Sequence, residues 1–86
     1  MKVQAYASFR KLYRKLPAAI RRKVLRQIRQ IAKNPQHPSL QVKRIRGTAD
    51  IWEARVDLQY RMTFERHGDS IFLRVVANHD EALKNP

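Results

Sequence analysis

Apolar and polar side chains alternate along two neighbouring stretches of the chain, residues 51–56 and 60–65. Successive side chains of a β-strand point to opposite faces, so this alternation predicts two strands. A tight hairpin over residues 57–59 would bring their apolar members together on one buried face. The polar members Glu53, Arg55 and Arg61 would then lie close together on the open face of a sheet. The predicted buried set is Trp52, Ala54, Val56, Tyr60, Met62 and Phe64.

The first half of the chain shows the three- and four-residue spacing of amphipathic helices. A short helix is predicted after Ser8, whose hydroxyl can cap its first turn. Pro17 suits the first turn of a second helix, because its missing N–H costs nothing there, and Asn34 with Pro35 ends it. The apolar stripes are Phe9, Leu12, Tyr13 and Leu16 in the first helix, and Ile20, Val24, Ile28, Ile31 and Ala32 in the second. The pattern predicts a helical hairpin with a strongly basic outer face.

Further short segments complete the pattern. Strands are predicted at residues 2–6, 40–45 and 71–76, a helical turn at 79–83, and tight turns between them where glycine occurs. The order β, α, α and then four strands predicts an α+β fold, in which both helices pack on one face of a mostly antiparallel sheet of four to five strands. The chain has 86 residues, is 43% apolar and shows no repeat or linker, so residues 1–86 are expected to form one domain.

The charge of the chain is large and unevenly distributed. Residues 1–49 hold 14 of the 19 Lys and Arg residues and no Asp or Glu, whereas residues 50–86 hold 5 basic and 7 acidic residues. The first part is therefore +14 and the second −2, which gives the overall +12. A field of this sign attracts polyanions, of which nucleic acid is the commonest in a cytosol. A helix lying on a membrane surface is the competing interpretation, but a chain this short needs its apolar stripe for its own core.

Several classes of protein are disfavoured by what the sequence lacks. There is no cysteine, which excludes a disulfide framework or a thiolate metal site and suits a reducing compartment. The first residues lack the apolar stretch of a signal peptide, and no segment approaches the about 20 apolar residues that a membrane span needs. His79, Asp80 and Glu81 are adjacent and cannot converge well on one metal ion. We therefore expect a cytoplasmic protein with no metal site, no cofactor and no membrane partner.

Four weak motifs stand in a recognisable order: KRIRG at 43–47, IWEARV at 51–56, YRMTF at 60–64 and LRVVANHDE at 73–81. With these motifs and this order of elements, the chain resembles the RelE/ParE superfamily of bacterial toxins over essentially its whole length. The resemblance implies a toxin of a type II toxin–antitoxin system, neutralised by a separately encoded acidic antitoxin. One branch of the superfamily enters the ribosomal decoding site and cuts mRNA without a metal. A second branch poisons DNA gyrase and is not a nuclease.

The residue chemistry favours the mRNA endoribonuclease branch. Metal-free RNA cleavage needs a base for the 2′-hydroxyl, a cation at the phosphorane oxygens and an acid for the leaving 5′-oxygen. Arg61 is the first candidate for the cation, since its planar fork matches two phosphate oxygens and the resemblance implies a catalytic arginine at this position. The resemblance also implies acid or base roles for His79 and Glu53, and imidazole titrates near neutral pH. Arg55 is then a second phosphate ligand or holds Glu53 in place.

Each of these residues also has a purely structural interpretation. Arg61 can be a solvated or ion-paired strand arginine, and Glu53 can be a cross-strand salt-bridge partner of Arg55 or Arg61. His79 can be a helix-cap or packing residue held by Asp80. These alternatives stay open at the level of sequence.

The remaining aromatic and imidazole side chains are assigned no chemistry. Trp52 is expected in the core rather than as a platform for a nucleobase, because Ala54 and Val56 share its face. His37 and His67 are expected in loops, without a functional role.

The predicted helices carry basic residues without interleaved acids, which favours a phosphate-binding surface over an ordinary solvated face. A ribosome presents phosphates on several sides, and an acidic, partly disordered antitoxin can use the same surface. The candidate RNA-binding residues are Arg22, Arg26 and Arg29 in the second helix, Lys43, Arg44 and Arg46 in the basic strand and turn, and Arg55.

One departure from the family pattern bears on the choice of branch. Family nucleases often place a tyrosine or second histidine near the end of the chain, whereas no aromatic residue follows Phe72 here. A nucleobase at the cut site would lack its usual stacking partner. Weak catalysis, gyrase inhibition and a basic RNA-binding module without chemistry therefore remain alternatives.

Overall fold

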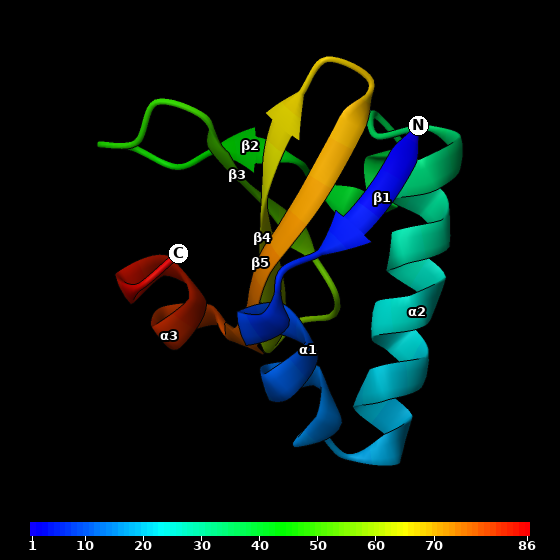
Figure 1. The fold of residues 1–86 in the computed structure, drawn as a ribbon. Coiled ribbons are helices and arrows are strands. Elements are labelled where there is room, and N and C mark those ends of the chain that lie inside the picture. The colour runs from blue at the N-terminus through cyan, green and yellow to red at the C-terminus, as the bar shows by residue number, and fades with distance from the viewer.

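The computed structural model describes residues 1–86 and has the predicted α+β architecture (Figure 1). Its strands are β1 (Lys2–Ala5), β2 (Lys43–Arg44), β3 (Ile51–Arg55), β4 (Tyr60–His67) and β5 (Ser70–Asn78). Its helices are α1 (Ala7–Arg14), α2 (Ala18–Lys33), the 3-10 helix η1 (Pro38–Leu40) and α3 (His79–Lys84). The helical hairpin and the order of elements expected from the sequence are confirmed.

The five strands form one mixed sheet in the order β1-β5-β4-β3-β2. β1 runs parallel to β5, and all other neighbouring strands are antiparallel. Phe64 of β4 is opposite Leu73 of β5, but Thr63 is opposite Val75, so Arg74 is an extra residue in β5. Such a β-bulge re-aims the side chain that it carries.

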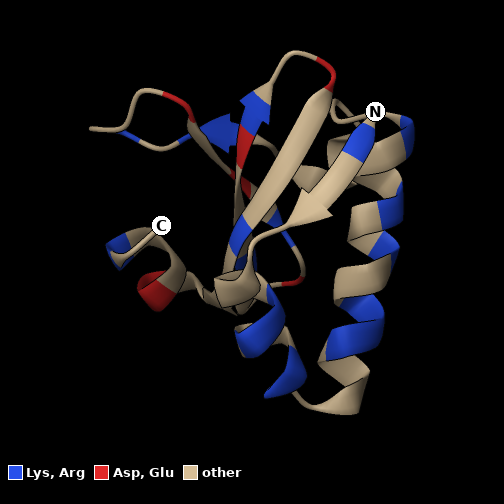
Figure 2. Ribbon diagram, in the orientation of Figure 1, with Lys and Arg blue, Asp and Glu red and all other residues tan.

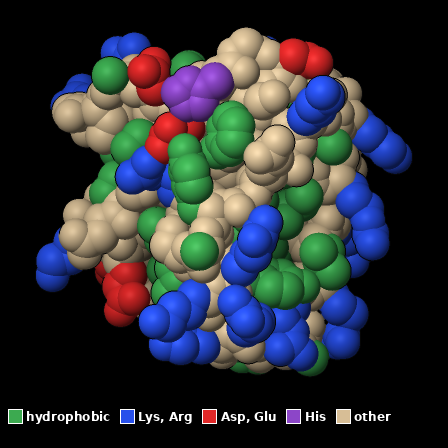
Figure 3. Space-filling model, viewed as in Figure 1, with side chains coloured by type: hydrophobic (Ala, Val, Ile, Leu, Met, Phe, Trp, Pro, Cys, Tyr) green, Lys and Arg blue, Asp and Glu red, His purple; other side chains and the backbone are tan.

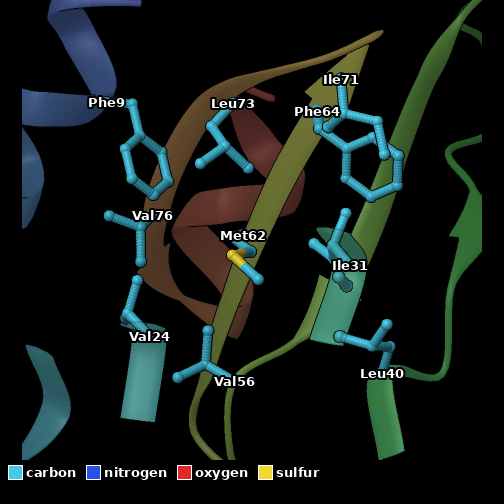
Figure 4. Close-up of a cluster of buried hydrophobic side chains, with 11 residues drawn as sticks. Phe9, Val24, Ile31, Leu40, Val56, Met62, Phe64, Ile71, Leu73 and Val76 are labelled. Atoms are coloured by element: carbon cyan, nitrogen blue, oxygen red, sulfur yellow. The ribbon is translucent and has the colours of Figure 1, made fainter. Parts of the chain in front are cut away.

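The hydrophobic core lies between the helical hairpin and one face of the sheet (Figure 4). The predicted alternation of β3 and β4 is confirmed, since the side chains of Ala54, Val56, Met62 and Phe64 are buried, and Trp52 and Tyr60 pack against them. The helices contribute Phe9, Val24 and Ile31, and β5 contributes Ile71, Leu73 and Val76. Trp52 therefore belongs to the core, as expected.

The opposite face of the sheet is partly covered by α3, which Figure 1 shows on the other side of the sheet from α2. Ala82 of α3 is fully buried, and Thr63 of β4 is also fully buried. The Thr63 hydroxyl donates a hydrogen bond of 2.9 Å to the carbonyl oxygen of Pro86. The polar face of β3 and β4 is thus less open than the sequence suggested, because a single helical turn after β5 is long enough to fold back over it.

Two predictions about local structure in the first half of the chain were wrong. The strand expected at residues 40–45 is reduced to β2, because residues 38–40 form a 3-10 turn and Gln41 has a left-handed backbone with φ of 45°. Ser8 does not cap α1. The helix begins after Tyr6 without a side-chain cap, and the Ser8 hydroxyl instead donates to the carbonyl oxygen of Arg74, tying α1 to the bulge in β5.

Candidate nucleic-acid interface and active site

Arg55 and Arg61 occupy directly opposing positions on β3 and β4, and Ala77 of β5 is opposite Arg61 on the other side. The hairpin expected around residues 57–59 therefore has the register that brings the two arginines together. Neither side chain forms an ion pair. Like charges opposite each other in a sheet destabilise it, so this pair of cations is a natural place for an anion to bind.

The Arg61 guanidinium is held at the end of the hairpin by the backbone. Its Nη1 donates to the carbonyl oxygens of Asp57, at 2.5 Å, and Tyr60, at 3.0 Å. Nε and Nη2 make no hydrogen bond within the chain, so they remain available to a ligand. These bonds fix the orientation of the charge before any ligand arrives, and such preorganisation is what an electrostatic catalyst needs.

Asp57 organises the loop that holds Arg61. Its Oδ1 accepts the backbone N–H groups of Gln59, at 2.9 Å, and Tyr60, at 2.8 Å, and its Oδ2 lies 3.1 Å from the Lys23 ammonium of α2. Burial of the Asp57 carboxylate raises its pKa. The two N–H donors and Lys23 together lower the pKa by more than burial raises it, so the pKa lies below its usual value. Asp57 therefore stays charged and links the hairpin loop to α2.

His79 lies at the same end of the sheet as the two arginines. It is the first residue of α3, and its backbone N–H donates to the carbonyl oxygen of Gln59 at 2.7 Å. The side chain is 45% exposed and borders a hollow with Tyr60 and Asn78. Its Nδ1 is 3.5 Å from a carboxylate oxygen of the fully exposed Asp80. Asn78, rather than His79, caps α3, because its side chain accepts the N–H of Glu81. The imidazole is thus accessible to a ligand.

Glu53 is on the predicted face but is not open to solvent. The residue is only 4% exposed, and its nearest cation is the Lys43 ammonium at 3.8 Å. Leu83 of α3 borders the same hollow, which explains the burial. The alternative in which Glu53 forms an ion pair with Arg55 or Arg61 is not seen, because the cation next to Glu53 is Lys43 on the neighbouring strand.

The other candidate RNA-binding residues form two groups. Lys43, Arg44 and Arg46 border the hollow that contains Glu53, on the side of the sheet where α3 lies. Arg22, Arg26 and Arg29 are exposed on α2. Figure 2 shows basic positions along α2 with no acidic position in that helix, and Figure 3 shows Lys and Arg side chains gathered over the helical hairpin. The structure does not bring the α2 group next to Lys43 and its neighbours.

A second polar cluster, centred on Glu65, was not anticipated. Glu65 forms an ion pair with Arg74, lies 2.8 Å from His67 Nε2 and accepts a 3.2 Å hydrogen bond from the Tyr6 hydroxyl. The hydrogen bond with His67 is the main cause that lowers the pKa of Glu65; burial opposes it and Arg74 adds to it. Burial, followed by the Glu65 charge, raises the pKa of Tyr6. The prediction that His67 lies in a loop was wrong, because His67 is the last residue of β4.

No three His, Cys, Asp or Glu side chains gather at one point where they could hold a metal ion. No helix has the length and apolar character needed to span a membrane.

Comparison with known proteins decides the family. A family model described as a ParE-like toxin domain matches residues 18–81. The chain belongs to the ParE-like toxin family. It is therefore a toxin of the RelE/ParE superfamily, the toxins of type II toxin–antitoxin systems, and the resemblance found in the sequence is confirmed.

Solved structures show the same fold in other toxins of this superfamily. A YoeB/ParE toxin from Agrobacterium tumefaciens superposes with a TM-score of 0.75 and 19% identity, over 92% of this toxin and 99% of that chain. The RelB–RelE antitoxin–toxin complex from Methanococcus jannaschii gives 0.77 and 22%, over 96% and 99%. The RelBE2 complex from Mycobacterium tuberculosis gives 0.77 and 20%, over 91% and 96%. No curated protein is similar enough in sequence to be matched.

Proposed function

We propose that this toxin is a ribosome-dependent, metal-independent mRNA endoribonuclease that inhibits translation. The observation that carries the proposal is the pair Arg55 and Arg61, two cations in opposing register without a carboxylate partner. A phosphodiester placed there would neutralise both. The charge that develops on the phosphorane oxygens during cleavage is greater than in the substrate, so the two guanidinium groups stabilise the transition state more than the bound RNA.

His79 is the proposed proton-transfer group of this centre. Cleavage starts when the 2′-hydroxyl attacks the neighbouring phosphorus, and a base must remove its proton while an acid protonates the leaving 5′-oxygen. The exposed imidazole, at the same end of the sheet as Arg61, can serve as either. Glu53 is a weaker candidate for the base than the sequence suggested, because it is buried beside Leu83.

Inhibition of DNA gyrase is the second candidate function. Two observations favour it: the family model is ParE-like, and no aromatic residue after Phe72 is available to stack on a nucleobase. In that case the basic surfaces would bind gyrase or its DNA, and Arg61 would have only a structural or binding role.

A protein antitoxin is the proposed partner in either case, since solved relatives of this fold are toxin–antitoxin complexes. An apolar hollow between β1, α1 and α2 is suited to such a partner. Seven of its nine lining residues are hydrophobic, among them Phe9, Tyr13 and Leu25, and Leu25 is 40% exposed. Arg10 also lines it, and further cations surround it on the helical hairpin (Figure 3). An amphipathic, acidic segment would match both the hollow and its surroundings.

The deciding experiment measures both activities of the purified toxin. Primer extension on ribosomes stalled on a defined message reports new RNA ends, and a supercoiled-plasmid assay with gyrase reports broken DNA. New RNA ends that appear only when ribosomes are present are the expected result. Gyrase-dependent DNA breaks without RNA cleavage would assign the toxin to the second function instead.

A further inference from the structure

A polar groove lies beside the Arg55–Arg61 pair. It is bounded by α2, by η1 and by the end of β3, and only one of its nine lining residues is hydrophobic. Its volume of about 430 Å³ falls within the range of small-ligand sites, about 300–1,000 Å³. The polar lining disfavours an apolar ligand. The groove contains Lys23, Arg26, Arg55 and His37. The sequence predicts no role for Lys23 or His37. It also does not place Arg26 and Arg55 in one site.

The walls of this groove are joined by one buried amide. Gln27 of α2 is 7% exposed, and its Nε2 donates to the carbonyl oxygens of Ser39, at 3.2 Å, and Arg55, at 2.8 Å. One side chain therefore links α2, η1 and β3. The groove is built before any ligand binds, so little conformational entropy is lost on binding.

His37 presents a defined hydrogen-bond donor. Its Nδ1 accepts the Ser39 backbone N–H at 3.2 Å and lies 2.8 Å from the Ser39 hydroxyl. These bonds occupy Nδ1 as an acceptor, so the proton of the neutral ring is on Nε2. The Nε2–H group makes no hydrogen bond within the chain and is available to an oxygen atom of a ligand.

The charges in the groove favour an anion. Lys23, Arg26 and Arg55 contribute three positive charges and Asp57 one negative charge, which leaves +2 with His37 neutral. Asp57 is already engaged by Lys23 and by two backbone N–H groups. Arg26 and Arg55 form no ion pair. The Arg26 guanidinium and the His37 N–H are suitable donors for phosphate oxygens, and Arg55 lines the groove beside them.

We propose that this groove binds a backbone phosphate of single-stranded RNA, next to the phosphate held by Arg55 and Arg61. The inference rests on the proposed nuclease function, because it extends the same RNA from one site to the other. Arg55 connects the two sites, because it lines the groove and is also the residue opposite Arg61 on the neighbouring strand. An RNA strand leaving the candidate centre along the edge of β3 meets the groove next, and the groove then fixes the direction in which the message crosses the toxin.

The test uses a fluorescent single-stranded hexamer of 2′-O-methyl uridine, which cannot be cleaved because it lacks the 2′-hydroxyl. Its affinity for the full-length toxin is measured by anisotropy over a series of salt concentrations. Arg26→Gln should weaken binding about tenfold and reduce the slope of log affinity against log salt by about 0.7. His37→Ala should weaken binding without changing the slope, because it removes a neutral donor.

Lys33→Gln is the matched control, since Lys33 is an exposed cation of the same helix that lies outside the groove. It should weaken binding less than twofold. Equal losses for Arg26→Gln and Lys33→Gln would overturn the proposal, because the loss would then come from the general positive field of the toxin. Binding of a polyglutamate peptide is measured with the same variants. The proposal would also be overturned if Arg26 and His37 mattered for binding of this peptide and not for binding of the RNA. Absence of ribosomal mRNA cleavage by the unsubstituted toxin would instead remove the proposed function and leave the oligonucleotide result unchanged.

Discussion

Arg55 and Arg61 face each other across β3 and β4, and no carboxylate pairs with either of them. The acidic residue of this face, Glu53, lies at the opposing position to Lys43 instead. The sheet therefore separates its one buried carboxylate from its two unpaired arginines. This separation leaves the arginines free for an anion from outside the chain.

Replacing Arg61 should abolish toxicity while leaving the fold intact. Arg61→Ala removes a phosphate ligand and also two hydrogen bonds to the loop, so we expect growth to resume and the free energy of unfolding to fall by about 1–2 kcal/mol. Growth after induction and urea unfolding followed by circular dichroism measure the two effects. Arg66→Ala, an exposed arginine of the same strand, is the control and should remain toxic. A folded Arg61→Ala protein with full toxicity would show that Arg61 is not part of the site.

Removing the imidazole of His79 should slow the chemical step selectively. His79→Ala is expected to lower single-turnover cleavage of ribosome-bound mRNA by about 10²–10⁴-fold while ribosome affinity stays nearly constant, because the lost contribution acts in the transition state. Primer extension gives the rate and co-sedimentation the affinity. His67→Ala, which removes an imidazole from the Glu65 cluster instead, should cleave at an almost normal rate. Intact cleavage by His79→Ala would move the acid–base role elsewhere.

The role of Glu53 can be separated from its ion pair by comparing two substitutions. If Glu53 has only a structural role, Glu53→Gln and Lys43→Ala should both lower the free energy of unfolding, and Lys43→Ala should lower it more because it leaves the buried Glu53 carboxylate without its cation. Glu53→Gln should then change cleavage little. A catalytic base loses activity only with Glu53→Gln. Because Glu53 is buried beside Leu83, we expect the first pattern in unfolding and cleavage assays. A hundredfold loss of cleavage confined to Glu53→Gln would contradict this.

Reversing the charge of the α2 face should weaken binding to the ribosome. Arg22, Arg26 and Arg29 are exposed and lie on a helix without acidic residues. Replacing them with Glu should lower the slope of log affinity against log salt by about 0.7–0.9 for each phosphate contact that is lost. Purified ribosomes and a salt series give the slope. An unchanged slope would assign this face to solvent or to the antitoxin alone.

The Glu65 cluster predicts how stability depends on acid. The pKa of Glu65 is lowered in the folded toxin, mainly by the hydrogen bond with His67, from the unperturbed 4.5. The unfolded chain therefore binds more protons, so this stabilisation is present above about pH 4.5 and is lost as the pH falls through the folded-state pKa. Urea unfolding below pH 5 should show a weaker pH dependence for Glu65→Gln than for the original toxin. Glu81→Gln, an exposed carboxylate without a hydrogen bond, should leave the dependence unchanged, and an unaltered slope in Glu65→Gln would contradict the assignment.

Periodicity alone was enough to predict the elements that carry the fold. The parity of residues 51–65 placed Arg55 and Arg61 close together on one face of the sheet, because a two-residue period with a short loop buries Met62 and Phe64 on the other face. The directly opposing register of the two arginines came from the structure. Parity did not predict exposure. The alternation placed Glu53 and Thr63 on the face of the sheet opposite the hydrophobic core. It could not show that α3, a six-residue helix, covers both residues through tertiary contacts.

Contacts between distant segments were beyond the reach of sequence patterns. The bond from Ser8 to Arg74 and the Glu65 cluster both involve β5, where the bulge at Arg74 interrupts the regular alternation. Gln27 gave no signal either, since a glutamine within a basic helix looks like any other solvated residue until the ends of η1 and β3 are placed against it.

The parallel pairing of β1 with β5 has a consequence for synthesis of the toxin. Residues 2–5 find their partners at residues 70–73, so closing this pair must bring together segments that are separated by almost the whole chain. Non-local pairing of this kind slows folding. A nascent chain can form its cationic helical hairpin early. It acquires β1 as a sheet edge, and His79 at the same end of the sheet as Arg61, only after β5 has left the exit tunnel. The proposed centre therefore forms only after most of the toxin has been translated. The ribosome that synthesises the toxin is thus not exposed to its proposed activity while synthesis is under way.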